Sequence, residues 1–276
     1  MNLEKIYAHH PLTERAIRTR LDRQRIHPDT VTEWHLALDP ELELTDQNHP
    51  GGVQAVLELA VAARITSTSL VVDVGAGLGG SMRVLAEALG CRAIGVERDA
   101  SRHRDAVTLT ALVRLDHLVE IRQRDALLSR DRIDRMDVLW GQAAWVHFPD
   151  PRRFLDLWLP AVSPHGCVAM ADIFLRRTPA TADERTLIAD LEDIWGAHLL
   201  PLSAWTDPLG DHEFATSYLQ ECTHDTVASF LRLTAAASRW ADGTVTEDER
   251  RGWRCALDGF SAGLLVAYQL VAIRKG

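Results

Sequence analysis

Residues 71–80 read VVDVGAGLGG, an apolar run with one acid, Asp73, that ends in closely spaced glycines. Residues 81–89 (SMRVLAEAL) follow at once and favour a helix. Residues 91–97 (CRAIGVE) form a second short apolar run that finishes on Glu97. This order of strand, glycine turn, helix, strand and acid predicts a unit of a parallel sheet that binds a nucleoside cofactor at the carboxyl ends of its strands.

The glycine spacing alone does not identify the cofactor, because Gly75, Gly77 and Gly80 also satisfy the dinucleotide pattern G-x-G-x-x-G. Two features favour S-adenosyl-L-methionine (SAM) over a nicotinamide. Asp73 lies inside the strand, where a nicotinamide-binding strand is normally apolar. The chain also closes with a long β-type run, residues 264–273 (LLVAYQLVAI), and a final strand that inserts antiparallel is typical of the SAM-binding sheet. SAM is therefore the predicted cofactor.

The strand ends carry the predicted cofactor contacts. Gly75 and Gly77 allow the backbone to approach the amino-acid half of the cofactor without a Cβ clash. Glu97 is placed to accept both ribose hydroxyls, the alternative being a solvent-exposed acid at a strand end. After a third strand (residues 118–123), Asp125 is placed to accept the adenine amino group, and the backbone of Ala126 can donate to the ring. The alternative for Asp125 is a cap of a turn.

A fourth strand, residues 136–140, leads into a loop that lies beside the expected switch point of the sheet, where the reacting end of a ligand sits. Gln142, Trp145 and His147 lie in this loop. His147 fits a catalytic histidine and a packing histidine equally well. A fifth strand, residues 167–172, ends on Asp172.

A polar loop, residues 45–52 (TDQNHPGG), precedes a predicted helix over 53–63. Backbone N–H groups at such a helix start can bind an anion. The alternative is an ordinary solvated helix entry with an Asp or Asn cap. His49 lies in this loop, so His49, His147 and Asp172 are the candidates for a catalytic base, with His212 as a further titratable group.

Bulk properties restrict the class of protein. A formal net charge of −9 argues against a nucleic-acid substrate, which requires a basic surface. The four cysteines are far apart and predict neither a metal site nor a disulfide framework. No apolar run is long enough for a membrane span, and the first residues (MNLEKIYAHH) lack the apolar core of a signal peptide. The sequence therefore predicts a cytoplasmic protein that acts on a small molecule.

The whole chain, residues 1–276, is predicted to be a single α/β domain with a doubly wound, mostly parallel seven-stranded sheet and a helical cap. The extension before the core looks helical and could cover the site, or could only pack or form a homodimer. The mostly helical region after the SAM-binding core is rich in aromatic residues. Such residues are more often buried in the hydrophobic interior than exposed in a substrate pocket. The predicted parts are an N-terminal helical cap (1–50), a SAM-binding core (51–175), a helical cap or substrate region (176–260) and a final strand (261–276).

Over residues 45–275 the chain resembles the class I SAM-dependent methyltransferases. The matching segments are VVDVGAGLGG (71–80), GVE (95–97), RDAL (124–127), WVHFPD (145–150), PHGCVAMADIF (164–174) and the closing run. Residues 46–52 (DQNHPGG) are similar to a stretch of the sarcosine/dimethylglycine N-methyltransferase branch.

The resemblance implies a role for individual residues. Gly75 and Gly77 would contact the methionine part, Glu97 the ribose and Asp125 the adenine. Gln142 and Trp145 would lie near the sulfonium, and His49 would help to close the site. The turn before the fifth strand reads Pro-His-Gly here where the family usually has Pro-Gly-Gly, and Trp-Gly-Gln replaces a serine-rich loop after the fourth strand.

The sequence thus predicts in-line methyl transfer from SAM to an amine, hydroxyl or activated carbon of a small metabolite. An alternative is other SAM chemistry, such as cyclisation of the SAM aminobutyl chain with release of methylthioadenosine. A non-catalytic SAM-binding protein is a third class, disfavoured because all the cofactor positions are filled.

Overall fold

The computed structural model describes residues 10–130, 132–240 and 245–275, so residues 1–9 of the predicted N-terminal cap lie outside the described residues. The described strands form one seven-stranded sheet in the order β3-β2-β1-β4-β5-β7-β6. The strands are β1 (Leu70–Val74), β2 (Arg92–Glu97), β3 (Val119–Gln123), β4 (Met136–Gln142), β5 (Val162–Leu175), β6 (Phe214–Glu221) and β7 (Leu265–Arg274). The five strands β1 to β5 pair in parallel, and β7 is antiparallel to both β5 and β6. The predicted sheet and the antiparallel final strand are therefore confirmed.

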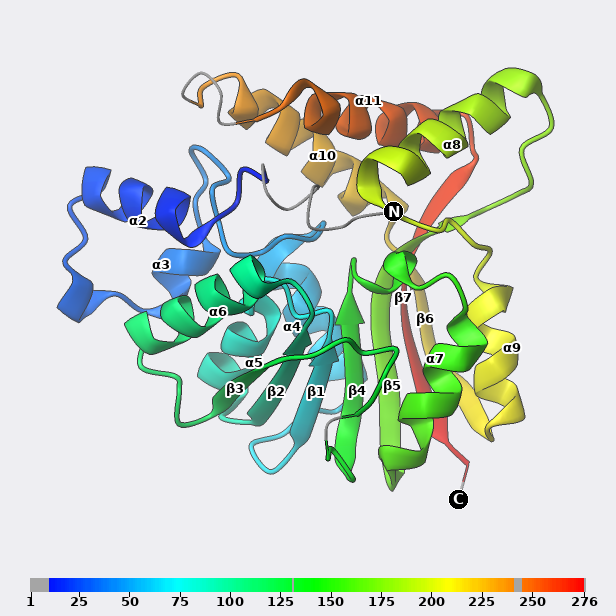
Figure 1. The fold of residues 1–276 in the computed structure, drawn as a ribbon, viewed down its shortest axis with the longest axis horizontal. Coiled ribbons are helices and arrows are strands. Elements are labelled where there is room, and N and C mark those ends of the chain that lie inside the picture. The colour runs from blue at the N-terminus through cyan, green and yellow to red at the C-terminus, as the bar shows by residue number, and fades with distance from the viewer. Residues whose placement is uncertain (1–9, 131, 241–244, 276) are drawn as a thin grey trace.

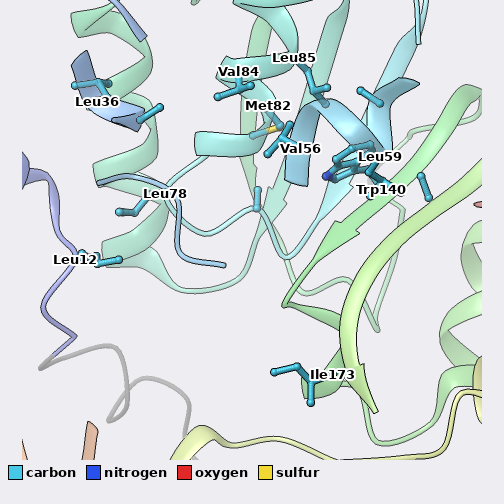
Figure 2. Packing of buried hydrophobic residues seen from close by; sticks show 14 of the residues in the cluster. Leu12, Leu36, Val56, Leu59, Leu78, Met82, Val84, Leu85, Trp140 and Ile173 are labelled. Carbon is cyan, nitrogen blue, oxygen red and sulfur yellow. The ribbon is translucent and has the colours of Figure 1, made fainter. Parts of the chain in front are cut away.

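Helices cover both faces of the sheet because alternate residues of the buried strands point to opposite sides. On β1, Val71 packs in one buried cluster, whereas Val72 and Val74 pack in the other. Figure 2 shows the first cluster, in which side chains of α4 (Gly52–Ala62) and α5 (Gly80–Leu89) gather near Trp140 of β4. The second cluster contains α7 (Pro151–Trp158) and α9 (Ser203–Asp211).

A helical layer lies across the top of the sheet in Figure 1, above the ends at which β4 and β5 finish. It consists of α8 (Ala182–Trp195), α10 (Thr223–Ala237) and α11 (Glu247–Ser261). The shorter α2 (Glu14–Arg23) and α3 (Glu33–Ala37) lie beside α6 (Ala100–Leu112) at the left of the same view. The remaining elements within the described ranges are three short 3-10 helices, Pro28–Thr30, Trp145–His147 and Leu159–Ala161. These helices enclose the space beyond the strand ends, where ligands bind in sheets of this kind.

The region 176–260, predicted to be mostly helical, also contains the edge strand β6. Only Phe214 of this strand is buried, so its sequence, FATSYLQE, lacks the alternation that reveals a half-buried strand. Two other boundaries differ from the prediction. The fourth strand continues to Gln142, and the fifth strand begins at Val162, so Pro164 lies within a strand rather than in a turn before it.

Candidate active site

The turn between β1 and α5 is built from glycines in the left-handed region, Gly75 with φ 86°, Gly77 with φ 55° and Gly79 with φ 77°. A Cβ on Gly75 would lie 2.6 Å from the Cβ of Ala144, so this position has no room for a side chain. A Cβ on Gly77 would meet no protein atom within 4 Å, so the space beside it is open. The turn therefore presents bare backbone to a cavity.

This cavity, of about 510 Å³, is called the glycine-turn cavity. It is lined by the carboxyl ends of β1, β2 and β4 and by the loop after β3, and its volume is within the range of small-molecule sites. The predicted site residues on its wall are Asp73, Gly75, Gly77, Glu97, Asp125, Ala126, Gln142, His147 and His49.

Two buried carboxyl groups lie on the wall of the glycine-turn cavity. Asp73 is 4% exposed and Glu97 is 7% exposed. Burial and the neighbouring Glu97 raise the pKa of Asp73 to about 8. Burial also raises the pKa of Glu97, and this shift is opposed by two backbone N–H groups. Those donors are Gly77, 2.8 Å from Oε2, and Asp99, 2.7 Å from Oε1. Each oxygen of Glu97 therefore keeps a lone pair for a ligand hydroxyl.

The far end of the cavity is formed by the loop after β3. Asp125 accepts a hydrogen bond from the backbone of Leu127 through Oδ1 at 2.9 Å, and its other oxygen lies 3.8 Å from Arg98. The carbonyl of Ala126 accepts from Trp158 Nε1 at 2.9 Å, which fixes the loop to α7. The backbone at 125–126 is thus held in place beside the cavity.

Trp145 does not lie where the resemblance implied, and this corrects the prediction that it lies near a sulfonium. Its indole is fully buried, its Nε1 donates to the carbonyl of Val74 at 3.1 Å, and its ring stacks on Trp205 at 5.4 Å between centroids. Gly141 explains this position, because a Cβ there would lie 2.1 Å from Trp145 Nε1. Trp140 is likewise fully buried in the core.

Asp172 holds the loop after β4 rather than presenting a free carboxylate. Its Oδ2 accepts from the backbone of Trp145 at 3.0 Å and of Val146 at 3.2 Å, and its Oδ1 accepts from Ile173 at 2.9 Å. Burial raises the pKa of Asp172 to about 7, against the effect of these N–H donors. Its oxygens are therefore used to position backbone.

The two histidines predicted as candidates both border the cavity, and burial lowers the pKa of each. His147 Nδ1 lies 3.0 Å from the carbonyl of Gly196, so this nitrogen carries the proton and Nε2 has the lone pair. His49 Nε2 lies 3.1 Å from Gln47 Oε1 and 3.2 Å from Ser81 Oγ. The other candidate, His212, pairs with Asp156 at 2.6 Å and borders none of the cavities described here.

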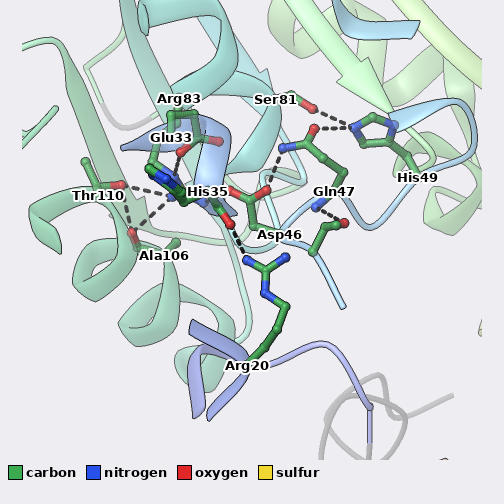
Figure 3. A network of polar contacts seen from close by, with 11 residues as sticks. Arg20, Glu33, His35, Asp46, Gln47, His49, Ser81, Arg83, Ala106 and Thr110 are labelled. Atoms are coloured by element: carbon green, nitrogen blue, oxygen red, sulfur yellow. Dashed lines mark hydrogen bonds and ion pairs between the residues drawn. The ribbon is translucent and has the colours of Figure 1, made fainter. Parts of the chain in front are cut away.

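A buried polar network holds the loop of His49, as Figure 3 shows. Arg83 of α5 donates to Glu33 Oε2 at 2.9 Å and to Asp46 Oδ2 at 2.6 Å. Burial and the nearby Asp46 raise the pKa of Glu33 well above its usual range, which Arg83 opposes. Asp46 Oδ1 accepts from Gln47 Nε2 at 2.7 Å, which turns the amide oxygen of Gln47 toward the histidine. No motif in the sequence predicts this network. Its one signal was an arginine, Arg83, in a mostly apolar helix.

Two further cavities adjoin the glycine-turn cavity. The larger, about 620 Å³, is called the aromatic cavity because Trp195, Phe230 and Trp253 line it. The smaller, about 270 Å³, is called the amide cavity because two buried glutamines, Gln142 and Gln269, line it. All three cavities meet at His49 and Ala143, which border each of them.

No family model matches the chain. It is 28% identical to the chloroplastic tocopherol O-methyltransferase of Arabidopsis thaliana over 135 residues, which are 46% of this chain and 39% of that protein. It is 33% identical to the sarcosine/dimethylglycine N-methyltransferase of Halorhodospira halochloris over 101 residues, or 35% of this chain and 34% of that protein. The chain thus spans well under half of the length of either relative.

Solved structures share the fold across most of the chain. Geranyl diphosphate C-methyltransferase from Streptomyces coelicolor A3(2) superposes with a TM-score of 0.68 at 16% identity, covering 80% of this chain and 75% of that one. Phosphoethanolamine N-methyltransferase 2 of Haemonchus contortus gives 0.72 at 15% identity, covering 94% and 60%. The sheet order found here is that of the methyltransferase fold. The chain has the fold of the class I SAM-dependent methyltransferases and is similar in sequence to the two small-molecule methyltransferases named above over less than half of its length.

The part of the chain that the structure describes contains no group of three or more His, Cys, Asp or Glu side chains arranged to hold a metal ion. Its four cysteines, Cys91, Cys167, Cys222 and Cys255, are free thiols. Nor is any helix of the described ranges long and apolar enough to cross a membrane.

Proposed function

We propose that this chain transfers the methyl group of SAM to a small molecule bound in the cavities beside the glycine turn. The observation that supports this most is that the glycine-turn cavity meets two further cavities at His49 and Ala143. A methyl donor in the first cavity would have an acceptor site next to its reacting end. Ring closure within SAM itself requires no second site, so this arrangement favours an external acceptor over the cyclisation alternative.

The residues on the cavity wall fit the proposed cofactor. Glu97 has an oxygen for each of two ribose hydroxyls, and its charge is supported by the N–H groups of Gly77 and Asp99. The open space at Gly77 suits a methionine moiety against bare backbone. Asp73, close by, can face its ammonium group. Asp125 and the backbone of Ala126 are placed for the adenine.

SAM supplies an electrophilic methyl group on a positively charged sulfur. The protein's contribution is to bring the acceptor atom in line with the bond that breaks, which is an effect of position rather than of charge. An amine acceptor needs only to arrive deprotonated, whereas a hydroxyl or carbon acceptor needs a base.

We assign the base role to His147 and a positioning role to His49. The Gly196 carbonyl fixes the proton of His147 on Nδ1, and the lowered pKa keeps the ring neutral at pH 7, so Nε2 can take a proton. His49 is bound to Gln47 and Ser81 and stands where the cavities meet. Asp172 supports His147 by holding the backbone at 145–146.

The acceptor is proposed to have an apolar body, because three large rings line the aromatic cavity. The names of the two relatives indicate chemically different substrates, a tocopherol for one and sarcosine or dimethylglycine for the other. A test incubates the chain with SAM and either a chromanol-type phenol or sarcosine, and measures S-adenosylhomocysteine and the methylated product by mass. Turnover of the phenol supports the proposal, whereas turnover of sarcosine alone contradicts the apolar acceptor.

The expectations of a homodimer and of a cytoplasmic location stay predictions. Light scattering on the purified chain tests the first, and imaging of a tagged chain in its native cells tests the second.

A further inference from the structure

Two residues that line the amide cavity each have a buried side-chain atom without a hydrogen-bond partner among the described residues, namely Gln142 Nε2 and Gln269 Oε1. Gln142 is 8% exposed and Gln269 is 2% exposed. A buried polar atom without a partner destabilises the fold, so two of them on the wall of one cavity indicate that a ligand supplies their partners.

The two glutamines stand in one row across the sheet. Gln142 of β4 pairs with Ala171 of β5, and Ala171 pairs with Gln269 of β7. Residues in register on neighbouring strands point to the same face, and both side chains reach the face covered by α4 and α5. The small Ala171 lies between them, and all three residues line the amide cavity.

The orientation of each amide is set by its other hydrogen bond. Gln269 Nε2 donates to the carbonyl of Ala55 at 3.1 Å, so its oxygen is the atom left without a partner. Gln142 Oε1 accepts from Ser81 Oγ at 2.9 Å, so its N–H₂ group is left without one. The pair therefore offers one donor and one acceptor from opposite sides of Ala171.

We propose that this row is the polar subsite of the acceptor and that it selects a neutral group carrying both a hydrogen-bond acceptor and a hydrogen-bond donor, as in a dihydroxy ring or a hydroxyamide. The glutamine backbones are two strand spacings apart, about 10 Å. The amide donor and the amide acceptor therefore reach two separate polar atoms of the ligand. This inference rests on the proposed function only for naming the ligand as the methyl acceptor.

The surrounding charges disfavour an anion. Three acids, Glu58, Asp172 and Asp225, line the amide cavity together with one base, Arg232, which already lies 3.5 Å from Glu43. A carboxylate would also face the oxygen of Gln269, and an ammonium group would face the N–H₂ of Gln142. Burying a carboxylate charge beside these acids is more costly than burying a hydroxyl.

Resorcinol, a neutral ring with two hydroxyls, is a suitable probe, and sarcosine is the zwitterionic comparison. Binding to the full chain is measured by saturation-transfer NMR, with and without S-adenosylhomocysteine. We expect resorcinol to bind, Gln269→Leu to weaken it about tenfold, and sarcosine to show no binding. Ala171→Leu, which fills the space between the amides, is expected to abolish binding.

Gln220→Leu is the matched control, because Gln220 continues the same row on β6 but is exposed and does not line the cavity. It is expected to bind resorcinol as the wild type does. Absence of resorcinol binding to the wild type, equal binding by Gln269→Leu, or preferential binding of sarcosine would overturn the proposal. The NMR experiment measures binding and does not need turnover. If the chain does not bind SAM but Gln269→Leu still weakens resorcinol binding, the proposed function is wrong and the subsite stands.

Discussion

Replacing Glu97 tests the cofactor assignment at one side chain. Its two oxygens are already held by the N–H groups of Gly77 and Asp99, so the carboxylate is oriented before any ligand arrives. Each hydrogen bond from a ribose hydroxyl to this charged group contributes about 1.5–3 kcal/mol. Because part of that gain is offset by further desolvation of a carboxylate whose pKa burial already raises, the expected loss in Glu97→Ala is about 2–4 kcal/mol.

This loss corresponds to a SAM affinity that is roughly 30- to 1000-fold weaker, which calorimetric titration can measure. Glu97→Gln keeps the shape but replaces one acceptor by a donor, and we expect an intermediate loss. Glu120→Ala is the control, since Glu120 is an exposed acid on the neighbouring strand β3 that does not line the glycine-turn cavity. Unchanged SAM affinity in Glu97→Ala, with the fold intact by circular dichroism, would refute the placement of the ribose.

Three further predictions concern the same cavity. Gly77→Val should fold but be less stable, because a Cβ there meets no protein atom within 4 Å whereas a φ of 55° strains a β-branched residue by about 1–2 kcal/mol. It should also weaken SAM binding at least tenfold by filling ligand space, and calorimetry beside a thermal melt separates the two effects. Asp73→Asn should be more stable than wild type, and the difference in unfolding free energy should grow from about pH 4 to pH 8, to a few kcal/mol at most. The reason is that the carboxyl group ionises near 3.8 in the unfolded chain, whereas in the folded chain it stays protonated up to about 8. Denaturant titrations in which this difference is the same at both pH values would contradict the raised pKa. His147→Asn should lower kcat on a hydroxyl acceptor by roughly 10²–10⁴-fold, and the wild-type rate should fall only below about pH 6.5, since the lowered pKa keeps the ring neutral above that; an unchanged kcat would remove His147 as the base.

The features that could be predicted from the sequence are those encoded within one strand–turn–helix unit. The backbone conformation of the turn itself requires Gly75 and Gly77. Glu97 could be placed at the carboxyl edge of the sheet because it is the last residue of the next apolar run. The final strand was recognisable because most of its residues are buried and the run is apolar. Such signals are local, so a single sequence carries them.

What could not be predicted depends on contacts between distant segments. The position of Trp145 is decided by the space at Gly141 and by stacking on Trp205, neither of which has a pattern in the sequence. Strand β6 is an exposed edge strand and lacks alternation. Arg83 and Asp46 come together only when the 46–52 loop lies on α5, where a Cβ at Gly80 would be 2.5 Å from the carbonyl of Asp46.

The same limit applies to the acceptor site. Gln269 is one polar residue in an apolar final strand, and only the register of β4, β5 and β7 brings it into a row with Gln142. The loop histidines were found by residue type, but their separate roles follow from the partners of their ring nitrogens.

Methyl transfer from SAM to an external acceptor can be followed with SAM that is labelled in its methyl group. The purified chain is incubated with labelled SAM, with and without a phenol that carries an apolar body. The products are then separated and identified by mass spectrometry. We expect S-adenosylhomocysteine together with a labelled, methylated phenol, and neither product when the phenol is omitted. Methylthioadenosine formed from SAM alone, with no S-adenosylhomocysteine, would contradict this expectation.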